Sequence, residues 1–255
     1  MNRFLAVIPA RYGSSRFEGK PLVDIFGKPM IRHVWERASE SFTHCVVATD
    51  DRRIEDAAEA FGATVIMTST EHRSGTERSN EARAKAEELF GMQFDIVVNI
   101  QGDEPFIHTS QLELIKGCFD DDTTQIATLV KPFDSGEDIF NENSPKVVCA
   151  VNGDALYFSR SVIPFLRGYD KEHWQSSHPF FKHIGLYGYR SDVLSQICSL
   201  PVGELEMCES LEQLRWLENG YTIRTAVTDC QSHAIDTPAD LETVLREYAH
   251  LFGKI

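Results

Sequence analysis

Short apolar runs alternate with segments of helical periodicity through the first half of the chain. The runs have strand length, and in the stretches between them apolar residues recur every three or four positions. This alternation is typical of β-α-β units and predicts a mostly parallel sheet flanked by helices. The predicted strands are Phe4 to Pro9, Cys45 to Thr49, Thr64 to Met67 and Asp95 to Ile100, and the predicted helices are Met30 to Glu40, Asp51 to Phe61 and Thr76 to Phe90.

The pattern is less regular in the second half, which we expect to be a mixed α+β region. Strands are predicted at Ile126 to Lys131, Lys146 to Val151, Ala155 to Phe158 and Tyr221 to Val227, and helices at Asp192 to Cys198, at Leu205 to Asn219 and from Pro238 onward. Two stretches, Phe133 to Pro145 and Leu166 to Pro179, have the composition of loops.

Composition excludes several classes of protein. The 255 residues carry a formal net charge of −14, whereas nucleic-acid binders usually have a basic surplus, so we expect no nucleic-acid partner. No apolar run has the length of a membrane-spanning helix and the start of the chain lacks a signal peptide, so we expect a cytoplasmic protein without membrane insertion. The 6 cysteines form no CxxC pair, which argues against a zinc site or a disulfide scaffold.

The first predicted strand runs into a basic loop of small residues that contains Arg11, Arg16 and Lys20. Backbone N–H groups of Gly and Ser residues can cradle phosphate oxygens, and the cations would offset phosphate charge in an otherwise acidic protein. Pro21 stands where a Walker loop needs Ser or Thr, so the loop is not of that type. The alternative is a solvated basic turn.

Two aspartates are candidate metal ligands. Asp103 follows the buried strand at Asp95 to Ile100, at the edge where parallel sheets bind ligands. Asp236 precedes Thr237, which has the sequence features of a helix N-cap. Mg²⁺ prefers carboxylate, phosphate and water oxygens, so the two together could hold a nucleotide-bound metal. The alternatives are that Asp103 caps the helix near Thr109 and that Asp236 only supports its cap.

Three further segments combine polar and apolar residues. Residues 71–78 form a polar turn before a helix, which either contacts a base or only caps the helix. In the predicted helix at Leu205 to Asn219, Glu209, Glu212 and Gln213 have the spacing of one helix face, which could bind sugar hydroxyls or simply be solvated. His183 lies in the segment Lys182 to Arg190. A lone histidine in such a segment is more often a packed, hydrogen-bonded residue than a catalytic one.

Together, these segments resemble the 3-deoxy-manno-octulosonate (Kdo) cytidylyltransferase family. The resemblance extends from Phe4 to about Leu245 and rests on motifs in family order: IPARYGSSRFEGKPL, FGKPMI, VVATDD, HRSGTER, VNIQGDEP, ALYFSR with Ile163-Pro164, HIGLYGYR, LEQLR and IDTPADL. One departure is visible, because Phe17 and Glu18 stand where the family usually has leucine and proline before Gly-Lys-Pro-Leu. Glu18 adds negative charge near the expected phosphates.

The resemblance implies a Rossmann-like nucleotide-diphospho-sugar transferase fold, with a mostly parallel central sheet and a smaller mixed lobe for sugar binding and dimerisation. It implies one domain over residues 1–255, with a nucleotide-binding part at about 1–130, a sugar-binding part at about 131–230 and a C-terminal metal-ligand segment at about 231–255. The implied reaction is the Mg²⁺-dependent conversion of CTP and Kdo to CMP-Kdo and pyrophosphate in lipopolysaccharide synthesis, by a homodimer. In the implied mechanism, the anomeric hydroxyl of Kdo would attack the α-phosphorus in line.

The family's residue roles carry over to matching positions of this chain. Arg11, Lys20, Asp103 and Asp236 would be catalytic, the two aspartates as metal ligands. The nucleotide would contact Ala10, Arg11, Ser14, Arg16, Lys20, Ser74, Gly75, Arg78 and Gln101. The sugar would contact Gln101, Arg160, His183, Tyr187, Glu209, Glu212 and Gln213.

Other functions stay open at this stage. A cytidylyltransferase of the same fold could act on an 8-amino Kdo analogue or, less in keeping with the HRSGTER and QGDEP segments, on a sialic acid. A regulator that binds nucleotide without catalysis is a rival of another class, although Lys20, Asp103 and Asp236 are all retained. A dehydrogenase is the weakest alternative, because no GxGxxG follows the first strand.

Overall fold

The computed structural model describes residues 2–13, 16–231 and 233–252. The chain divides into two compact units, of which unit 1 contains residues up to Leu112 together with those from Gln231 onward, and unit 2 contains Glu113 to Cys230. The C-terminal segment belongs to the same unit as the N-terminal part.

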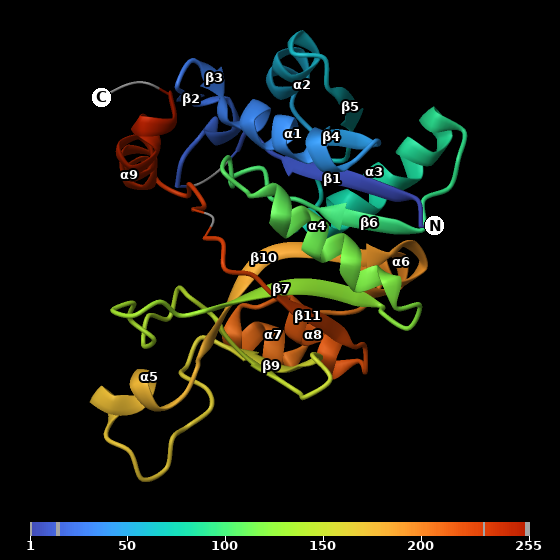
Figure 1. Ribbon diagram of the computed structural model, residues 1–255. Coiled ribbons are helices and arrows are strands. Elements are labelled where there is room, and N and C mark those ends of the chain that lie inside the picture. The colour runs from blue at the N-terminus through green and yellow to red at the C-terminus, as the bar shows by residue number, and fades with distance from the viewer. Residues whose placement is uncertain (1, 14–15, 232, 253–255) are drawn as a thin grey trace. The chain divides into compact units, whose positions relative to one another are not determined.

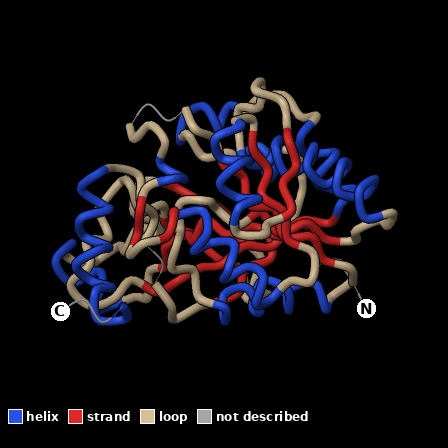
Figure 2. The backbone as a smooth tube through the Cα atoms, turned by 90° about the horizontal axis from the view of Figure 1, so that it is seen from above, coloured by secondary structure: helices blue, strands red, loops and turns tan. Residues whose placement is uncertain are grey.

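Unit 1 is built around four parallel strands in the order β6-β1-β4-β5 (Figure 1). The expected alternation of strands and helices is confirmed and is visible in red and blue in Figure 2. The strands are β1 (Phe4–Ala10), β4 (Cys45–Thr49), β5 (Thr64–Met67) and β6 (Ile96–Asn99), with a hairpin of β2 (Asp24–Ile25) and β3 (Lys28–Pro29); the helices are α1 (Met30–Ser41), α2 (Arg52–Ala60), α3 (Gly75–Phe90) and α9 (Pro238–Tyr248), with 3₁₀ turns η1 (Lys20–Leu22) and η4 (Ala249–Phe252).

Helix α9 is attached to the start of unit 1 by an apolar cluster. Ile235 and Val244 are fully buried against Ile25 and Met30, and the Phe106 and Tyr248 rings stack at a centroid distance of 4.1 Å. Burying such side chains contributes about 1.5–3 kcal/mol each relative to exposure. In Figure 1, β1 runs toward the side of the unit where α9 lies, so the chain returns to the carboxyl ends of the strands.

Unit 2 is the mixed region expected from the second half of the sequence. Strand β7 pairs in parallel with β11 and in antiparallel with β10, and β8 pairs in antiparallel with both β10 and β9. The strands are β7 (Ile126–Pro132), β8 (Lys146–Cys149), β9 (Ala155–Ser159), β10 (Phe181–Arg190) and β11 (Ile223–Val227); the helices are α5 (Trp174–Ser177), α6 (Ser191–Cys198), α7 (Glu204–Glu209) and α8 (Gln213–Glu218), with 3₁₀ turns η2 (Cys118–Asp120) and η3 (Lys171–His173). Helix α4 (Thr109–Gly117) crosses the boundary between the units.

Sequence periodicity did not predict β10, nor the short hairpin of β2 and β3, nor α5, which lies within the stretch Leu166 to Pro179 that was expected to be a loop. The register of β10 with β7 shifts between Ile184 and Tyr187, which breaks the simple alternation of apolar and polar residues. A Cβ at Gly188 would lie 2.5 Å from the Phe119 ring, so this glycine permits the close approach of η2.

The predicted helix at Leu205 to Asn219 is wrong as a single element. It is two helices, α7 and α8, separated at Ser210, whose φ of 51° is left-handed. Arg160 explains the break, because its Nε donates to the Glu209 carbonyl at 2.6 Å and its Nη2 to the Ser210 carbonyl at 3.3 Å. Glu209 therefore does not share one continuous helix face with Glu212 and Gln213.

Three lysines lie side by side on adjacent strands of unit 2 and anchor the loop at 133–145. Lys182 is paired directly with Lys131 on β7 and with Lys146 on β8, so their charges would repel one another. Each ammonium group instead has an acceptor in the loop. Lys131 donates to Asp134, Lys182 to Glu137 and Lys146 to the Asn141 carbonyl.

Candidate nucleotide and metal site

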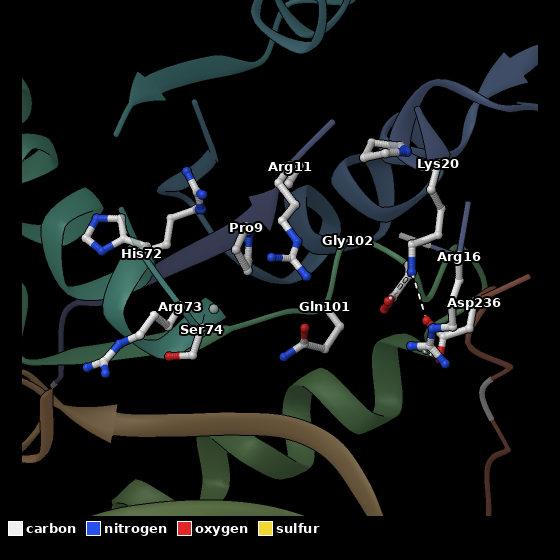
Figure 3. A pocket seen from close by; sticks show the side chains of 15 residues that line it. Pro9, Arg11, Arg16, Lys20, His72, Arg73, Ser74, Gln101, Gly102 and Asp236 are labelled. Atoms are coloured by element: carbon white, nitrogen blue, oxygen red, sulfur yellow. Dashed lines mark hydrogen bonds and ion pairs between the residues drawn. The ribbon is translucent and has the colours of Figure 1, made fainter. Parts of the chain in front are cut away.

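A polar pocket lies in unit 1 at the carboxyl ends of β1 and β6. Parallel neighbouring strands bring their carboxyl ends to one edge, which is why segments about 90 positions apart meet there. The pocket is lined by Pro9, Ala10, Arg11, Arg16, Lys20, Pro21, His72, Arg73, Ser74, Gly75, Arg78, Gln101, Gly102, Asp103 and Asp236. Figure 3 shows the Arg11 and Gln101 side chains extending into its centre.

Gly102 allows the two strand ends to lie close together. A Cβ at this position would be 2.7 Å from the carbonyl oxygen of Pro9, which is closer than a Cβ atom approaches an atom to which it is not bonded. Glycine therefore sets how near the Gln101–Asp103 turn comes to the end of β1.

Asp103 and Asp236 converge on one cation, the ammonium of Lys20. The Lys20 Nζ donates to Asp103 Oδ2 at 2.7 Å and to Asp236 Oδ1 at 3.0 Å. Arg16 Nη2 lies 3.2 Å from the other oxygen of Asp236, and Figure 3 shows Arg16 and Lys20 on either side of that carboxylate. The capping alternatives therefore do not account for the two carboxylates, since both side chains point at Lys20.

Local structure holds each of these three side chains. Lys20 begins η1 after Gly19, whose φ of 68° is left-handed and whose N–H donates to the Tyr12 carbonyl at 2.9 Å. Asp236 precedes the capping box of α9, in which Thr237 accepts from the Asp240 N–H, so the Asp236 carboxylate is left to face Lys20. The Ile235 N–H donates to the Asp103 carbonyl at 2.9 Å and ties the two acidic segments together.

The donor set fits a divalent cation that is bound together with phosphate. Mg²⁺ in nucleotide sites is commonly held by one or two carboxylates, with phosphates and water completing the octahedron. Two carboxylates converge here, and in the described ranges no cluster of three or more His, Cys, Asp or Glu side chains is suited to holding a metal. A metal at Asp103 and Asp236 would therefore need further ligands from a substrate.

The family departure at Phe17 and Glu18 leaves the pocket intact. Phe17 packs against the apolar cluster that joins α9 to the hairpin. Glu18 is exposed and does not line the pocket. The pKa of the Arg53 guanidinium is raised mainly by its hydrogen bond to Asp51, and the charge of Glu18 adds a small further increase. The extra negative charge therefore lies outside the lining of the pocket.

The N-terminus of α3 forms another wall of the pocket. Ser74 is its N-cap and accepts a hydrogen bond from the Glu77 N–H at 3.2 Å, so α3 begins one residue earlier than predicted. Gly75 lies against Pro9 and Asn99. The N-terminus of a helix carries unpaired N–H groups and a partial positive charge, both of which favour an anion.

Arg78 reaches the pocket from a buried ion pair. Its Nη2 is 2.7 Å from Asp50 Oδ2, and the exposed fractions of the two side chains are 4% and 15%. Its Nη1 donates to Thr68, whose hydroxyl in turn donates to the Thr49 carbonyl at 3.1 Å. The carboxyl ends of β4 and β5 thus fix the guanidinium.

The structure places most of the expected nucleotide residues in one pocket and adds several others. Ala10, Arg11, Arg16, Lys20, Ser74, Gly75, Arg78 and Gln101 all line it, whereas Ser14 lies outside the described residues. Sequence reasoning did not single out His72, whose Nε2 hydrogen-bonds Glu81, nor Asp50 behind Arg78. The sequence could have pointed to these two residues only through their places in motifs, His72 in HRSGTER and Asp50 near the end of VVATDD.

The expected sugar residues of unit 2 fall into two groups. Arg160 and Glu209 are joined to each other, since the Glu209 carboxylate accepts from the Ser159 hydroxyl at 2.7 Å and from the Arg160 N–H at 2.9 Å. The rings of His183 and Tyr187 form a second group, with centroids 5.2 Å apart. Burial lowers the pKa of His183 to about 4.

The remaining two sugar candidates lie at the start of α8. Glu212 pairs with Arg215 at 2.9 Å and is close enough to Tyr187 that it helps raise the pKa of that hydroxyl, after the larger effect of burial. Gln213 is buried, and its Nε2 has no hydrogen-bond partner in the described structure. A buried amide without a partner is costly, so this end of α8 has unused hydrogen-bonding capacity.

Two other sequence expectations concern the whole chain. All 6 cysteines carry thiols rather than disulfides, as expected from their scattered spacing. None of the helices in the described ranges has the length and apolar character needed to cross a membrane.

The chain matches known proteins over nearly its whole length. The cytidylyltransferase family profile matches residues 5–223. The chain is 55% identical over 249 residues to 3-deoxy-manno-octulosonate cytidylyltransferase from Parabacteroides distasonis, covering 96% of this chain and 98% of that protein. It is 57% identical over 242 residues to the protein of the same name from Phocaeicola vulgatus, covering 94% of each.

Solved structures give the same result. CMP:2-keto-3-deoxy-manno-octonic acid synthetase complexed with CTP superposes with a TM-score of 0.88 at 43% identity, covering 98% of this chain and 99% of that one. A Leptospira borgpetersenii cytidylyltransferase, with a TM-score of 0.61 at 16% identity, shares the fold. The expected nucleotidyltransferase fold is confirmed, and the chain belongs to the 3-deoxy-manno-octulosonate cytidylyltransferase family of enzymes.

Proposed function

We propose that this enzyme transfers CMP from CTP to the anomeric hydroxyl of Kdo, with release of pyrophosphate, and that Mg²⁺ is its cofactor. The observation that carries the proposal is the convergence of Lys20, Asp103 and Asp236 in a pocket that also presents Arg11, Arg16 and the N-terminus of α3. Relatives of known name and a CTP-complexed structure support the choice of substrates.

The basic side chains account for triphosphate binding in a protein of net charge −14. Arg11, Arg16 and Lys20 line one side of the pocket, and the N–H groups at the start of α3 line another. They would hold the phosphate chain, orient the α-phosphorus for in-line attack and offset the charge that develops on the leaving pyrophosphate. No covalent intermediate with the enzyme is required.

Asp103 and Asp236 would hold the metal, which, when bound, supplies Lewis-acid stabilisation of the phosphate oxygens. The carboxylate of Kdo lies beside its attacking hydroxyl, so two anionic substrates must be brought together. Gln101 would help to position nucleotide or sugar. Arg160, His183, Tyr187, Glu209, Glu212 and Gln213 would bind Kdo by resemblance to the family, and the free amide of Gln213 supports that role for the start of α8.

The deciding assay is pyrophosphate release by purified protein with Mg²⁺, CTP and Kdo. We expect release that EDTA abolishes and that UTP does not support. Parallel reactions with 8-amino-Kdo and N-acetylneuraminate test the two rival acids, and preference for either would keep the mechanism and change the substrate. CTP binding without release from any of the three acids would favour a non-catalytic regulator.

Asp103→Asn is the sharpest variant for this proposal. It removes one carboxylate charge from the site while preserving the size of the side chain, so we expect turnover to fall by about 100-fold or more, as for loss of a group that acts in the transition state. The melting temperature should stay near that of the wild type. Near-normal kinetics would remove Asp103 from the metal site.

We further propose a cytoplasmic homodimer that acts in lipopolysaccharide synthesis. Thiols in place of disulfides support a reducing compartment. Exposed Phe165 and Tyr169 lie on unit 2, where Phe165 packs edge-on against Trp174, and such a patch is typical of an interface. Light scattering of wild type and Phe165→Asp tests the dimer, which should shift toward the monomer in the variant.

A further inference from the structure

Lys20 occupies the point at which the two acidic side chains converge. Only 13% of its side chain is exposed, and its Nζ is within 3.0 Å of both carboxylates. With Arg16 beside Asp236, the group contains two negative and two positive charges. The pair of aspartates is therefore already neutralised without any metal.

A divalent cation bound to these oxygens would have to share its surroundings with that ammonium. Mg²⁺ binds carboxylate oxygens at about 2.1 Å, so an ion on Asp103 Oδ2, which is 2.7 Å from Nζ, would lie at most about 4.8 Å from Nζ. Repulsion between a dication and an ammonium at this distance opposes binding in a partly buried site. The metal can bind well only if Lys20 leaves.

Lys20 has another partner available when a triphosphate is present. It lines the same pocket as Arg11 and the N-terminus of α3, which favour anions. Its four-carbon side chain is flexible, so that its ammonium can exchange the carboxylates for a phosphate oxygen. The ammonium of Lys20 is then paired with a phosphate oxygen, and the metal is paired with the two carboxylates.

We propose that Lys20 is a resident cation that determines the form in which the site accepts metal, excluding the free divalent ion and admitting it together with a triphosphate. The inference rests on the proposed function, since it takes Asp103 and Asp236 as metal ligands. It assigns Lys20 a specificity role in addition to phosphate binding: metal alone would not occupy the enzyme before nucleotide arrives.

The test is direct binding of Mn²⁺ to the full-length protein without nucleotide, followed by electron paramagnetic resonance of the unbound ion. Lys20→Met should bind Mn²⁺ at least tenfold more tightly than wild type. Lys28→Met is the matched control, because it removes the same charge from a surface pair with Glu36 outside the pocket, and it should bind like wild type. Circular dichroism verifies that each variant is folded.

Two further measurements test whether the gain in Mn²⁺ affinity arises at the two aspartates. Adding Asp103→Asn to Lys20→Met should abolish the gained affinity. The analogue α,β-methylene-CTP keeps the triphosphate charge but cannot release pyrophosphate, and it should restore Mn²⁺ binding to wild type beyond the Mn²⁺ that the analogue binds in a protein-free control. Equal affinities of wild type and Lys20→Met, a gain that survives Asp103→Asn, or no restoration by the analogue would each overturn the proposal. If Lys20→Met does not fold, Lys20→Gln serves the same comparison. The pyrophosphate assay decides the proposed function separately.

Discussion

The buried ion pair of Asp50 and Arg78 can be compared with the exposed ion pair that the next residue, Asp51, forms with Arg53. Asp50 and Asp51 are adjacent, and each binds an arginine at a similar distance: 2.7 Å to Arg78 and 2.6 Å to Arg53. Burial distinguishes them, because Arg78 is 4% exposed and Arg53 is 58% exposed. Replacing each aspartate by asparagine therefore tests the effect of burial at nearly constant chemistry.

Asp50→Asn leaves the buried Arg78 charge without a counter-ion. Breaking a buried pair from one side commonly costs about 3–5 kcal/mol. Since Asp50 is 15% exposed and Arg78 keeps its hydrogen bond to Thr68, we expect the free energy of unfolding to fall by about 2–4 kcal/mol. Asp51→Asn should change it by less than about 1 kcal/mol, because the pair is solvated and asparagine is also a good N-cap for α2.

Equilibrium unfolding in urea, followed by circular dichroism, measures both changes. The slope of the transition must be the same in all three proteins, so that a shift of the midpoint reports stability alone. Because Arg78 lines the pocket, Asp50→Asn should also raise the KM for CTP, whereas Asp51→Asn should not. Equal losses of stability in the two variants would show that burial of the Arg78 pair has no energetic effect and would refute the reasoning.

Three other predictions follow from the described contacts. Gly102→Ala should lower both stability and activity, because the added Cβ would meet the Pro9 carbonyl at 2.7 Å; unchanged melting and kinetics would contradict this. Burial raises the pKa of the Cys45 thiol to about 12, so at pH 8 iodoacetamide should label exposed Cys208 first, as peptide mass spectrometry would show. Burial lowers the pKa of His183 to about 4, against about 6.5 in the unfolded chain, and so keeps the folded side chain neutral. The free energy of unfolding should therefore be unaffected by this group above pH 6.5 and fall by up to about 3 kcal/mol toward pH 4. His183→Gln should reduce that dependence on pH.

The sequence was most informative where local pattern and tertiary contacts agree. The strands at 45–49 and 64–67 match their predictions to the residue, since buried parallel strands are short apolar runs bounded by polar ones. It failed at Ser210, where no Gly or Pro marks the break and the cause is Arg160, 50 positions away. It also missed β10, where a register shift interrupts alternation.

The site shows the same division. Arg11, Lys20, Asp103 and Asp236 could be singled out because each follows or precedes a recognisable element, and the structure gathers them in one pocket. The direct contact of Lys20 with both aspartates could not be deduced, because only the fold sets which long side chain reaches which carboxylate. Asp50 could not be predicted as part of the site for a related reason. It does not line the pocket but holds Arg78, which does.

Because the C-terminal segment packs into unit 1, this unit cannot complete its contacts until nearly the whole chain has been synthesised. Lys20 and Asp236 are 216 positions apart, so at about 5–20 residues per second the ribosome adds the second carboxylate roughly 10–45 seconds after the lysine. Through that interval Ile25 and Met30 lack the Ile235 and Val244 side chains that bury them. Until Ile235 and helix α9 have been synthesised, the N-terminal part of the protein therefore keeps an exposed apolar surface to which chaperones can bind.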